Sequence, residues 1–140
     1  MPLGMLLVAL FSFALDRATK SLVARRLSPG QSVPVTSWLS LRRVVNARGV
    51  PLWLKPRGQL LVLSGLTAGI GLIIRQGHFF QHPAAQLGLA LALGGASSNV
   101  YDVLRRGAVL DFLDLGWWPI FNLADAAITL GVITALGFLY

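Results

Sequence analysis

The sequence contains no cysteine and no glutamate, so its five acidic residues are all aspartates. Without cysteine the chain can form no disulfide, no thiolate metal site and no cysteine nucleophile. Charged residues of both signs make up only 12% of the chain, whereas hydrophobic residues make up 55% and the mean hydropathy is +0.69. Such a composition is too apolar for an ordinary soluble domain of this length, and it indicates one membrane-embedded domain.

The few charges are unbalanced, with 12 basic residues against 5 acidic ones and a net charge of +7. In so apolar a chain, anionic lipid headgroups are a better partner for this charge than nucleic acid. His78 and His82 lie together in RQGHFFQHP, without a third type of metal ligand close in sequence. We interpret them as residues of a solvated loop, with a metal site as the weaker alternative.

Four apolar segments, at about 2–27, 59–75, 83–105 and 119–140, are expected to form transmembrane helices. A helix needs roughly 20 residues to cross a bilayer, a length that the first two segments reach only with the polar residues at their ends. The first segment lacks a basic start and an A-x-A-like site, so we expect a retained helix rather than a cleaved signal peptide. The small residues in SGLTAGIG and LGLALALGGASS favour close helix packing. The predicted fold class is an all-α integral membrane bundle of four helices.

Two polar loops separate these helices. The segment at about 30–57 includes the alternating stretch SVPVTSWLSLRRVVN and ends in a PRG turn, so it predicts a small extramembrane β-structure between the first two helices. The segment RRGAVLDFLDLGWW is mixed, and Trp117 and Trp118 are typical of a membrane–water interface. The basic residues gather on the side of these loops, with Arg75 alone on the other side. Charge alone would therefore place both loops in the cytoplasm.

Every aspartate lies within or at the end of an apolar segment, where an ionisable side chain is costly and is by default a functional candidate. Asp16 and Lys20, in DRATK, are spaced to form an ion pair on one helix face. Asn99 and Asp102 share a face with Arg106, which lies one turn further on. Instead of a functional role, Asn99 and Asp102 could simply form polar contacts between packed helices.

The remaining aspartates lie near the start of the fourth segment. Asn122 and Asp125, in FNLAD, suit a helix N-cap and an acid that complements the helix dipole. Asp111, in VLDF, lies among apolar residues, which is a poor place for an unpaired carboxylate. Asp114, near the Gly116 turn, is interpreted as a loop residue.

Two aspartates in a partly dry site cannot both ionise easily, so one can act as a base while the other acts as an acid. Such a pair can hydrolyse an amide with an activated water. The spacing of the residues leaves a proton relay open as an alternative.

The motifs DRATK, GGASSNVYD, VLDF and FNLADAAITLG occur in the order found in the lipoprotein signal peptidases (signal peptidase II), which this sequence resembles over nearly its whole length. The resemblance implies a membrane aspartyl endopeptidase that cuts a prolipoprotein just before its diacylglyceryl-modified cysteine, without a cofactor or metal. It implies Asp111 and Asp125 as the catalytic pair. The supporting or substrate-binding residues that it implies are Asp16, Lys20, Asn99, Asp102 and Asn122, together with Asn46 and Arg106 by less direct matches.

The resemblance also implies a location and partners. A multi-pass protein of the bacterial inner membrane is expected, with both termini in the cytoplasm and the active site toward the extracytoplasmic face. This orientation is opposite to the one that the distribution of basic residues predicts. The loop at about 30–57 corresponds to the family's small extramembrane β-cradle. The implied partners are a lipidated prolipoprotein and membrane phospholipids.

Three features of the chain differ from the usual pattern of that family. Ser98 stands where the family usually has glycine, and Val103 stands where it usually has arginine. NARGVPLW stands in place of an Asn-x-Gly motif followed by small residues and Phe. These differences leave open a divergent paralogue with a specialised substrate, and a membrane protein that binds lipidated peptides or a partner without cleaving them. A proton-coupled transporter is a weaker alternative, because the aspartates cluster toward one side.

Overall fold

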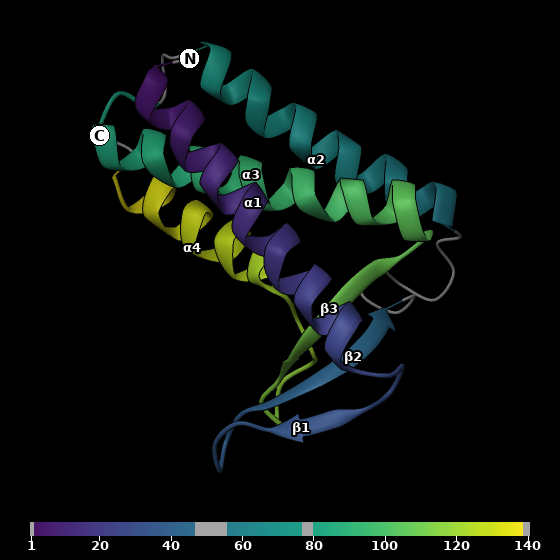
Figure 1. The fold of residues 1–140 in the computed structure, drawn as a ribbon. Coiled ribbons are helices and arrows are strands. Elements are labelled where there is room, and N and C mark those ends of the chain that lie inside the picture. The colour runs from purple at the N-terminus through teal and green to yellow at the C-terminus, as the bar shows by residue number, and fades with distance from the viewer. Residues whose placement is uncertain (1, 47–55, 77–79, 139–140) are drawn as a thin grey trace.

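The computed structural model describes residues 2–46, 56–76 and 80–138. Within these ranges the chain forms four helices and a small sheet of three strands (Figure 1). The elements in chain order are α1 (Leu3–Arg26), β1 (Ser32–Pro34), β2 (Ser40–Asn46), α2 (Pro56–Gln76), α3 (Pro83–Arg106), β3 (Val109–Asp114) and α4 (Leu123–Gly137). The sheet lies at one end of the helices, and the two ends of the chain lie away from it.

α3 is the central helix, because it contacts α1, α2 and α4. Small residues allow this packing. Gly94 lies against the backbone of Ala9 in α1, and Gly95 lies against the backbone of Ala124 in α4. A Cβ atom on Gly95 would be 2.6 Å from the Ala124 carbonyl oxygen, so a side chain there would push the two helices apart.

The sheet has the order β1-β2-β3, and both pairings are antiparallel. Val44 lies opposite Asp111, so β2 determines where this aspartate stands along β3. Val23 of α1 packs with Leu110 and Phe112 of β3 in a buried apolar cluster. The sheet is therefore packed directly against the helix that carries DRATK.

Arg43 of β2 provides a second link between the sheet and α1. Its Nη1 atom donates hydrogen bonds to the carbonyl oxygens of Ala24, at 3.1 Å, and Leu27, at 2.9 Å. Carbonyl groups at the end of a helix have no partner within the helix, and arginine satisfies them there. Arg43 thus fixes β2, and through it β3, to the end of α1.

The third strand corrects one expectation from the sequence. The predicted β-structure lay wholly at about 30–57, but its third strand comes from the segment between α3 and α4. Asp114 was interpreted as a loop residue and is in fact the last residue of β3, where its Oδ1 atom accepts a hydrogen bond of 2.8 Å from the Gly116 N–H.

The short motif NARGVPLW lies almost wholly at 47–53, outside the described residues.

The fourth helix starts later than expected. The prediction began at residue 119, whereas α4 begins at Leu123, because Phe121 pairs in an antiparallel bridge with Leu113 and Asn122 caps the helix. α2 starts at Pro56 instead of 59, which suits proline at the first helical position. The predicted end of the fourth helix at 140 lies three residues beyond Gly137, and the other helix bounds agree with the predicted ones to within one residue.

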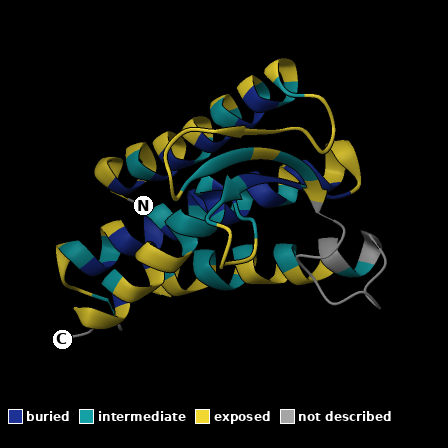
Figure 2. Cartoon of the chain, turned by 90° about the horizontal axis from the view of Figure 1, so that it is seen from below, coloured by how far each residue is buried: buried dark blue, intermediate teal, exposed yellow. Residues whose placement is uncertain are grey.

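Hydropathy distinguishes the helices from one another. Of the described helices, α3 is the one long and apolar enough to cross a membrane by these criteria alone, and Leu61–Gln76 and Leu123–Gly137 are shorter apolar helices. α1 is 24 residues long, but its second half carries the charges of DRATK and ARR. Exposed residues follow the outer faces of the helices (Figure 2), and many of them are leucines, such as Leu7, Leu66 and Leu130.

The close approach of α3 and α4 yields a test of the packing. Gly95→Ala should destabilise the protein by about 1–3 kcal/mol, because the new methyl group would meet the backbone of Ala124. Gly71→Ala, in α2, is the matched control, because none of the described residues beyond its own stretch of helix lies within 4 Å of where its new methyl group would stand. Thermal unfolding in detergent measures both variants. Equal melting temperatures would contradict the packing described here.

Candidate active site

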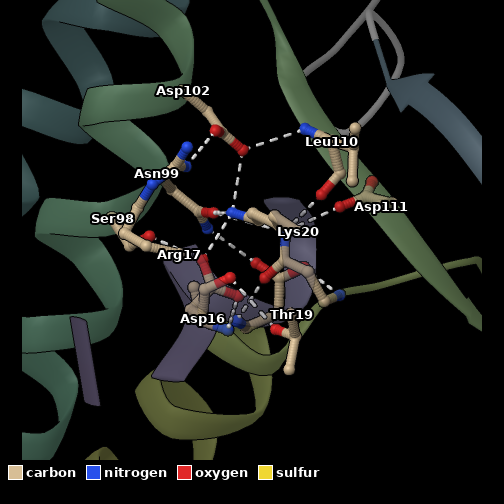
Figure 3. Close-up of polar contacts among 12 residues, drawn as sticks. Asp16, Arg17, Thr19, Lys20, Ser98, Asn99, Asp102, Leu110 and Asp111 are labelled. Carbon is tan, nitrogen blue, oxygen red and sulfur yellow. Dashed lines mark hydrogen bonds and ion pairs between the residues drawn. The ribbon is translucent and has the colours of Figure 1, made fainter. Parts of the chain in front are cut away.

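Most of the buried polar side chains gather where α1, α3, β3 and the start of α4 meet (Figure 3). Burying such groups is costly unless they are paired or hydrogen-bonded. All but one of the buried polar residues in the described ranges belong to this cluster, and its members are Asp16, Lys20, Ser98, Asn99, Asp102, Asp111 and Asn122. The exception is Ser12, which donates a hydrogen bond of 3.1 Å to the carbonyl oxygen of Leu91.

Lys20 is at the centre of the cluster, and its side chain is fully buried. Its Nζ atom is 2.6 Å from Asp16 Oδ2 and 2.8 Å from Asp102 Oδ2, and it donates to Asn99 Oδ1 at 2.9 Å. An ammonium group has three N–H donors and accepts no hydrogen bond, so these three oxygens satisfy it. The ion pair that the spacing of Asp16 and Lys20 predicted is present, and it is shared with a second helix.

Asp16 joins three helices through one carboxylate. Its Oδ2 atom also accepts a hydrogen bond from Ser98 Oγ of α3, at 2.6 Å. Its Oδ1 atom accepts from the backbone N–H of Ala124 in the first turn of α4, at 2.8 Å. The first N–H groups of a helix lack partners within it, so Asp16 acts as a cap supplied by another helix. Ser98, one of the departures from the family pattern, thus orients this carboxylate.

Asp102 joins α3 to α1 and to β3. Its Oδ1 atom forms an ion pair with Arg17 Nη1 and lies 3.6 Å from Arg106 Nε. Its Oδ2 atom accepts from the backbone N–H of Leu110, at 3.1 Å. The sequence did not single out Arg17, because its partner is 85 residues away.

The amide of Asn99 is oriented by the lysine. Its Oδ1 atom faces Lys20 and also accepts from Asn122 Nδ2, at 3.2 Å. Its nitrogen therefore points the other way, and it donates to Asp125 Oδ1 at 2.9 Å. The buried ions thus determine which end of Asn99 meets Asp125.

Asn122 contacts both aspartates of the predicted pair. It forms the capping box expected from FNLAD: its Oδ1 atom accepts from the Asp125 N–H at 2.8 Å, and its own N–H donates to Asp125 Oδ2 at 3.2 Å. With its oxygen so engaged, its Nδ2 atom donates to Asp111 Oδ1 at 2.7 Å. Asp111 is buried, and Asp125 is half-buried. The middle of β3 and the start of α4 thus bring both carboxylates to one asparagine.

Three further candidates lie elsewhere or play smaller parts. Arg106 is in the last turn of α3, where it forms an ion pair with Asp102 that is longer than those of Arg17 and Lys20. Asn46 pairs through its backbone with Val109, and its side chain is not described. His82 is exposed, as expected of a solvated loop, but it also caps α3 by accepting from the Ala84 N–H at 3.2 Å.

His78 lies outside the described residues. No cluster of three or more potential metal ligands occurs in the part of the chain that the structure describes.

The central lysine yields a prediction for stability. Lys20→Met should destabilise the protein by about 3–5 kcal/mol, because it leaves two fully buried carboxylates without their shared cation. Arg25→Met, at an exposed position of the same helix, should have little effect. Thermal unfolding in detergent and the yield of monodisperse protein measure both changes. Similar behaviour of the two variants would show that the buried ion pairs do not stabilise the fold.

Comparisons of the sequence agree with this geometry. The sequence profile of the family described as Signal peptidase (SPase) II matches residues 8–140. The lipoprotein signal peptidase of Moorella thermoacetica is 41% identical over 132 residues, which cover 91% of this chain and 87% of that protein. The lipoprotein signal peptidase of Syntrophomonas wolfei is 37% identical over 123 residues, with 87% and 83% covered.

Solved structures agree as well. A bacterial membrane enzyme determined by the in meso method at 2.3 Å has a TM-score of 0.77 and 27% identity, over 94% of this chain and 84% of that one. Another, at 1.9 Å, has a TM-score of 0.74 and 28% identity, over 94% and 89%. The resemblance found in the motifs is therefore confirmed over the whole fold. The chain belongs to the signal peptidase II family, the lipoprotein signal peptidases.

Proposed function

We propose that this protein is an aspartyl endopeptidase that removes the signal peptide from diacylglyceryl-modified prolipoproteins, with Asp111 and Asp125 as its catalytic pair. Relatives that match most of the chain are named lipoprotein signal peptidases. The observation that carries the proposal is the contact of Asn122 with both carboxylates, at 2.7 Å to Asp111 and 3.2 Å to Asp125. Two carboxylates next to one residue form the arrangement that acid–base hydrolysis requires.

In the proposed reaction a water molecule attacks the carbonyl carbon of the scissile peptide bond. One carboxylate of the pair takes a proton from this water as the C–O bond forms. The other carboxyl group gives its proton to the departing amine as the C–N bond breaks. We assign these two roles to Asp111 and Asp125 as a pair and not to either residue alone.

The buried ions act as positioning groups in this proposal. Lys20 orients Asn99 toward Asp125, and Asp16 holds the first turn of α4 through the Ala124 N–H. Asp102 holds the start of β3 through the Leu110 N–H, one residue before Asp111. Hydrogen bonds from a preorganised frame keep catalytic groups in place better than flexible contacts do. None of these three charged residues needs to touch the substrate to affect the rate.

We also propose that all four helices span the membrane. Their outer faces expose many large apolar side chains, as expected for contact with lipid. α4 has 15 residues and is about 22 Å long, so its ends need to lie near the bilayer boundaries. Trp117 and Trp118, which are exposed between β3 and α4, fit an interface at the end where the site lies. A lipidated peptide would reach the carboxylates there.

The proposed orientation follows from the substrate. Lipoprotein precursors are cleaved after export, so the site and the sheet would face the extracytoplasmic side, with both termini in the cytoplasm of the bacterial inner membrane. The basic residues near the site would then contact anionic phospholipids, which we propose as partners along with the lipidated precursor.

The catalytic pair is tested by isosteric substitution. Asp111→Asn and Asp125→Asn should each lower cleavage of a diacylated precursor by at least about 100-fold, because each removes one acid–base group. Asp114→Asn, at the end of the same strand as Asp111, should keep wild-type cleavage. A purified-enzyme assay measures the rates, and melting temperatures confirm that each variant is folded. Normal turnover by either catalytic variant would refute the pair, and binding without cleavage by the wild type would favour the non-catalytic alternative.

The orientation has its own test. A tag placed after Tyr140 should resist protease added to intact spheroplasts and become sensitive after lysis. A tag within the β1–β2 turn, at Ser37, should be cut in both states. A protease-sensitive C-terminal tag in intact spheroplasts would overturn the orientation and favour the one that the basic residues alone suggest.

A further inference from the structure

A pocket of about 240 Å³ opens beside the buried ions, and it is lined by Arg17, Tyr101, Arg105 and Arg106. It lies between α1 and the last turns of α3. Its walls are polar and basic, and no residue of the catalytic pair lines it. The pocket is therefore distinct from the proposed peptidase site, although Asp102 lies between the two.

The charges around this pocket leave an excess of positive charge. The nearby carboxylates, Asp16 and Asp102, are already engaged with Lys20, and Asp102 is also paired with Arg17 and Arg106. Arg105 forms no ion pair within the described ranges. Four cations thus face two carboxylates, and an anion in the pocket would balance the charge.

Arg17 is held in place for binding. Its guanidinium group is tied to Asp102 and lies 4.4 Å from the centre of the Tyr101 ring. A guanidinium group has five N–H donors, so one carboxylate contact leaves others for a ligand, and a fixed side chain loses little entropy on binding. The pocket has the volume of roughly eight water molecules, which is enough for a phosphate group with a small alcohol.

The surface of α1 beside the pocket is apolar. Phe13, Leu10 and Leu6 precede Arg17 by 4, 7 and 11 residues, a spacing that places all of them on one helix face. Leu6 and Leu10 are about half exposed, and the Phe13 ring contacts Tyr101 edge-on with ring centres 6.0 Å apart. A basic pocket at the end of an exposed apolar stripe matches a ligand with an anionic head and long acyl chains.

We propose that this pocket binds the phosphodiester of an anionic phospholipid, with its acyl chains along the face formed by Leu6, Leu10 and Phe13. The inference rests on the membrane placement proposed above, but it does not depend on the cleavage reaction. Arg17, Arg105 and Arg106 bind the phosphate oxygens, and the Tyr101 ring supports Arg17.

The test measures ligand-dependent melting temperatures of the detergent-purified protein, which report binding to the folded state. Phosphatidylglycerol should raise the melting temperature in a concentration-dependent way. Diacylglycerol, which has the chains without the phosphate, and glycerol phosphate, which has the phosphate without the chains, should each have a much smaller effect. Arg105→Gln should weaken phosphatidylglycerol binding by about fivefold.

Two variants make the result specific. Arg75→Gln removes the same charge from the last turn of α2 and should bind like the wild type. Asp111→Asn should lose cleavage but keep phosphatidylglycerol binding, so failure of the lipid site and failure of the peptidase proposal can be told apart.

Equal effects of phosphatidylglycerol and diacylglycerol, or equal binding by Arg105→Gln and Arg75→Gln, would overturn the phosphate site. If glycerol phosphate bound as tightly as phosphatidylglycerol, the acyl chains would contribute nothing, and the proposal that the bound phosphate belongs to a lipid would be overturned.

Discussion

The ammonium group of Lys20 meets two carboxylates and one amide oxygen in a space closed to solvent, and the remainder of the cluster is arranged around it. A buried cation requires such partners, because the interior offers no water to replace them. Meeting that requirement brings α1 and α3 into a single register. The same contacts orient Asn99: because its oxygen accepts from Lys20, its amide nitrogen is directed toward Asp125. Stability and the geometry of the proposed site therefore depend on the same charge.

Backbone packing makes this electrostatic arrangement possible. Gly94 and Gly95 lie on α3 one turn before Asn99, and each faces the backbone of a neighbouring helix. Because these glycines bring α1 and α4 close to α3, the short side chains of Asp16 and Ser98 can meet, at 2.6 Å. If α3 lay further from α1 and α4, longer side chains or trapped water would have to bridge the helices. Either would hold the buried polar residues less firmly.

The sequence could predict the features that depend on neighbouring residues. The ion pair of DRATK and the capping box of FNLAD follow from helical spacing, and the structure contains both. The strand around Asp111 could not be predicted in this way, because VLDFLD is extended through its pairing with β2, more than 60 residues earlier in the chain. The roles of Arg17 and Ser98 likewise depend on partners 85 and 82 residues away, so local spacing gives no signal for them. The start of α4 was placed too early because hydropathy does not reveal the backbone bridge between Phe121 and Leu113, which keeps the chain extended up to the Asn122 cap.

The separation between Asp16 and its partners has a consequence for biosynthesis. α1 leaves the ribosome long before α3, so Asp16, Arg17 and Lys20 at first lack their partners on α3, although Asp16 and Lys20 can already pair within α1. An isolated helix with these charges is costly to place in hydrocarbon, and its second half would remain at the headgroup level until α3 is inserted. Assembly of the bundle would then draw that half inward as the ion pairs form. With the membrane placement proposed for the four helices, completion of the buried cluster would commit α1 to the bundle.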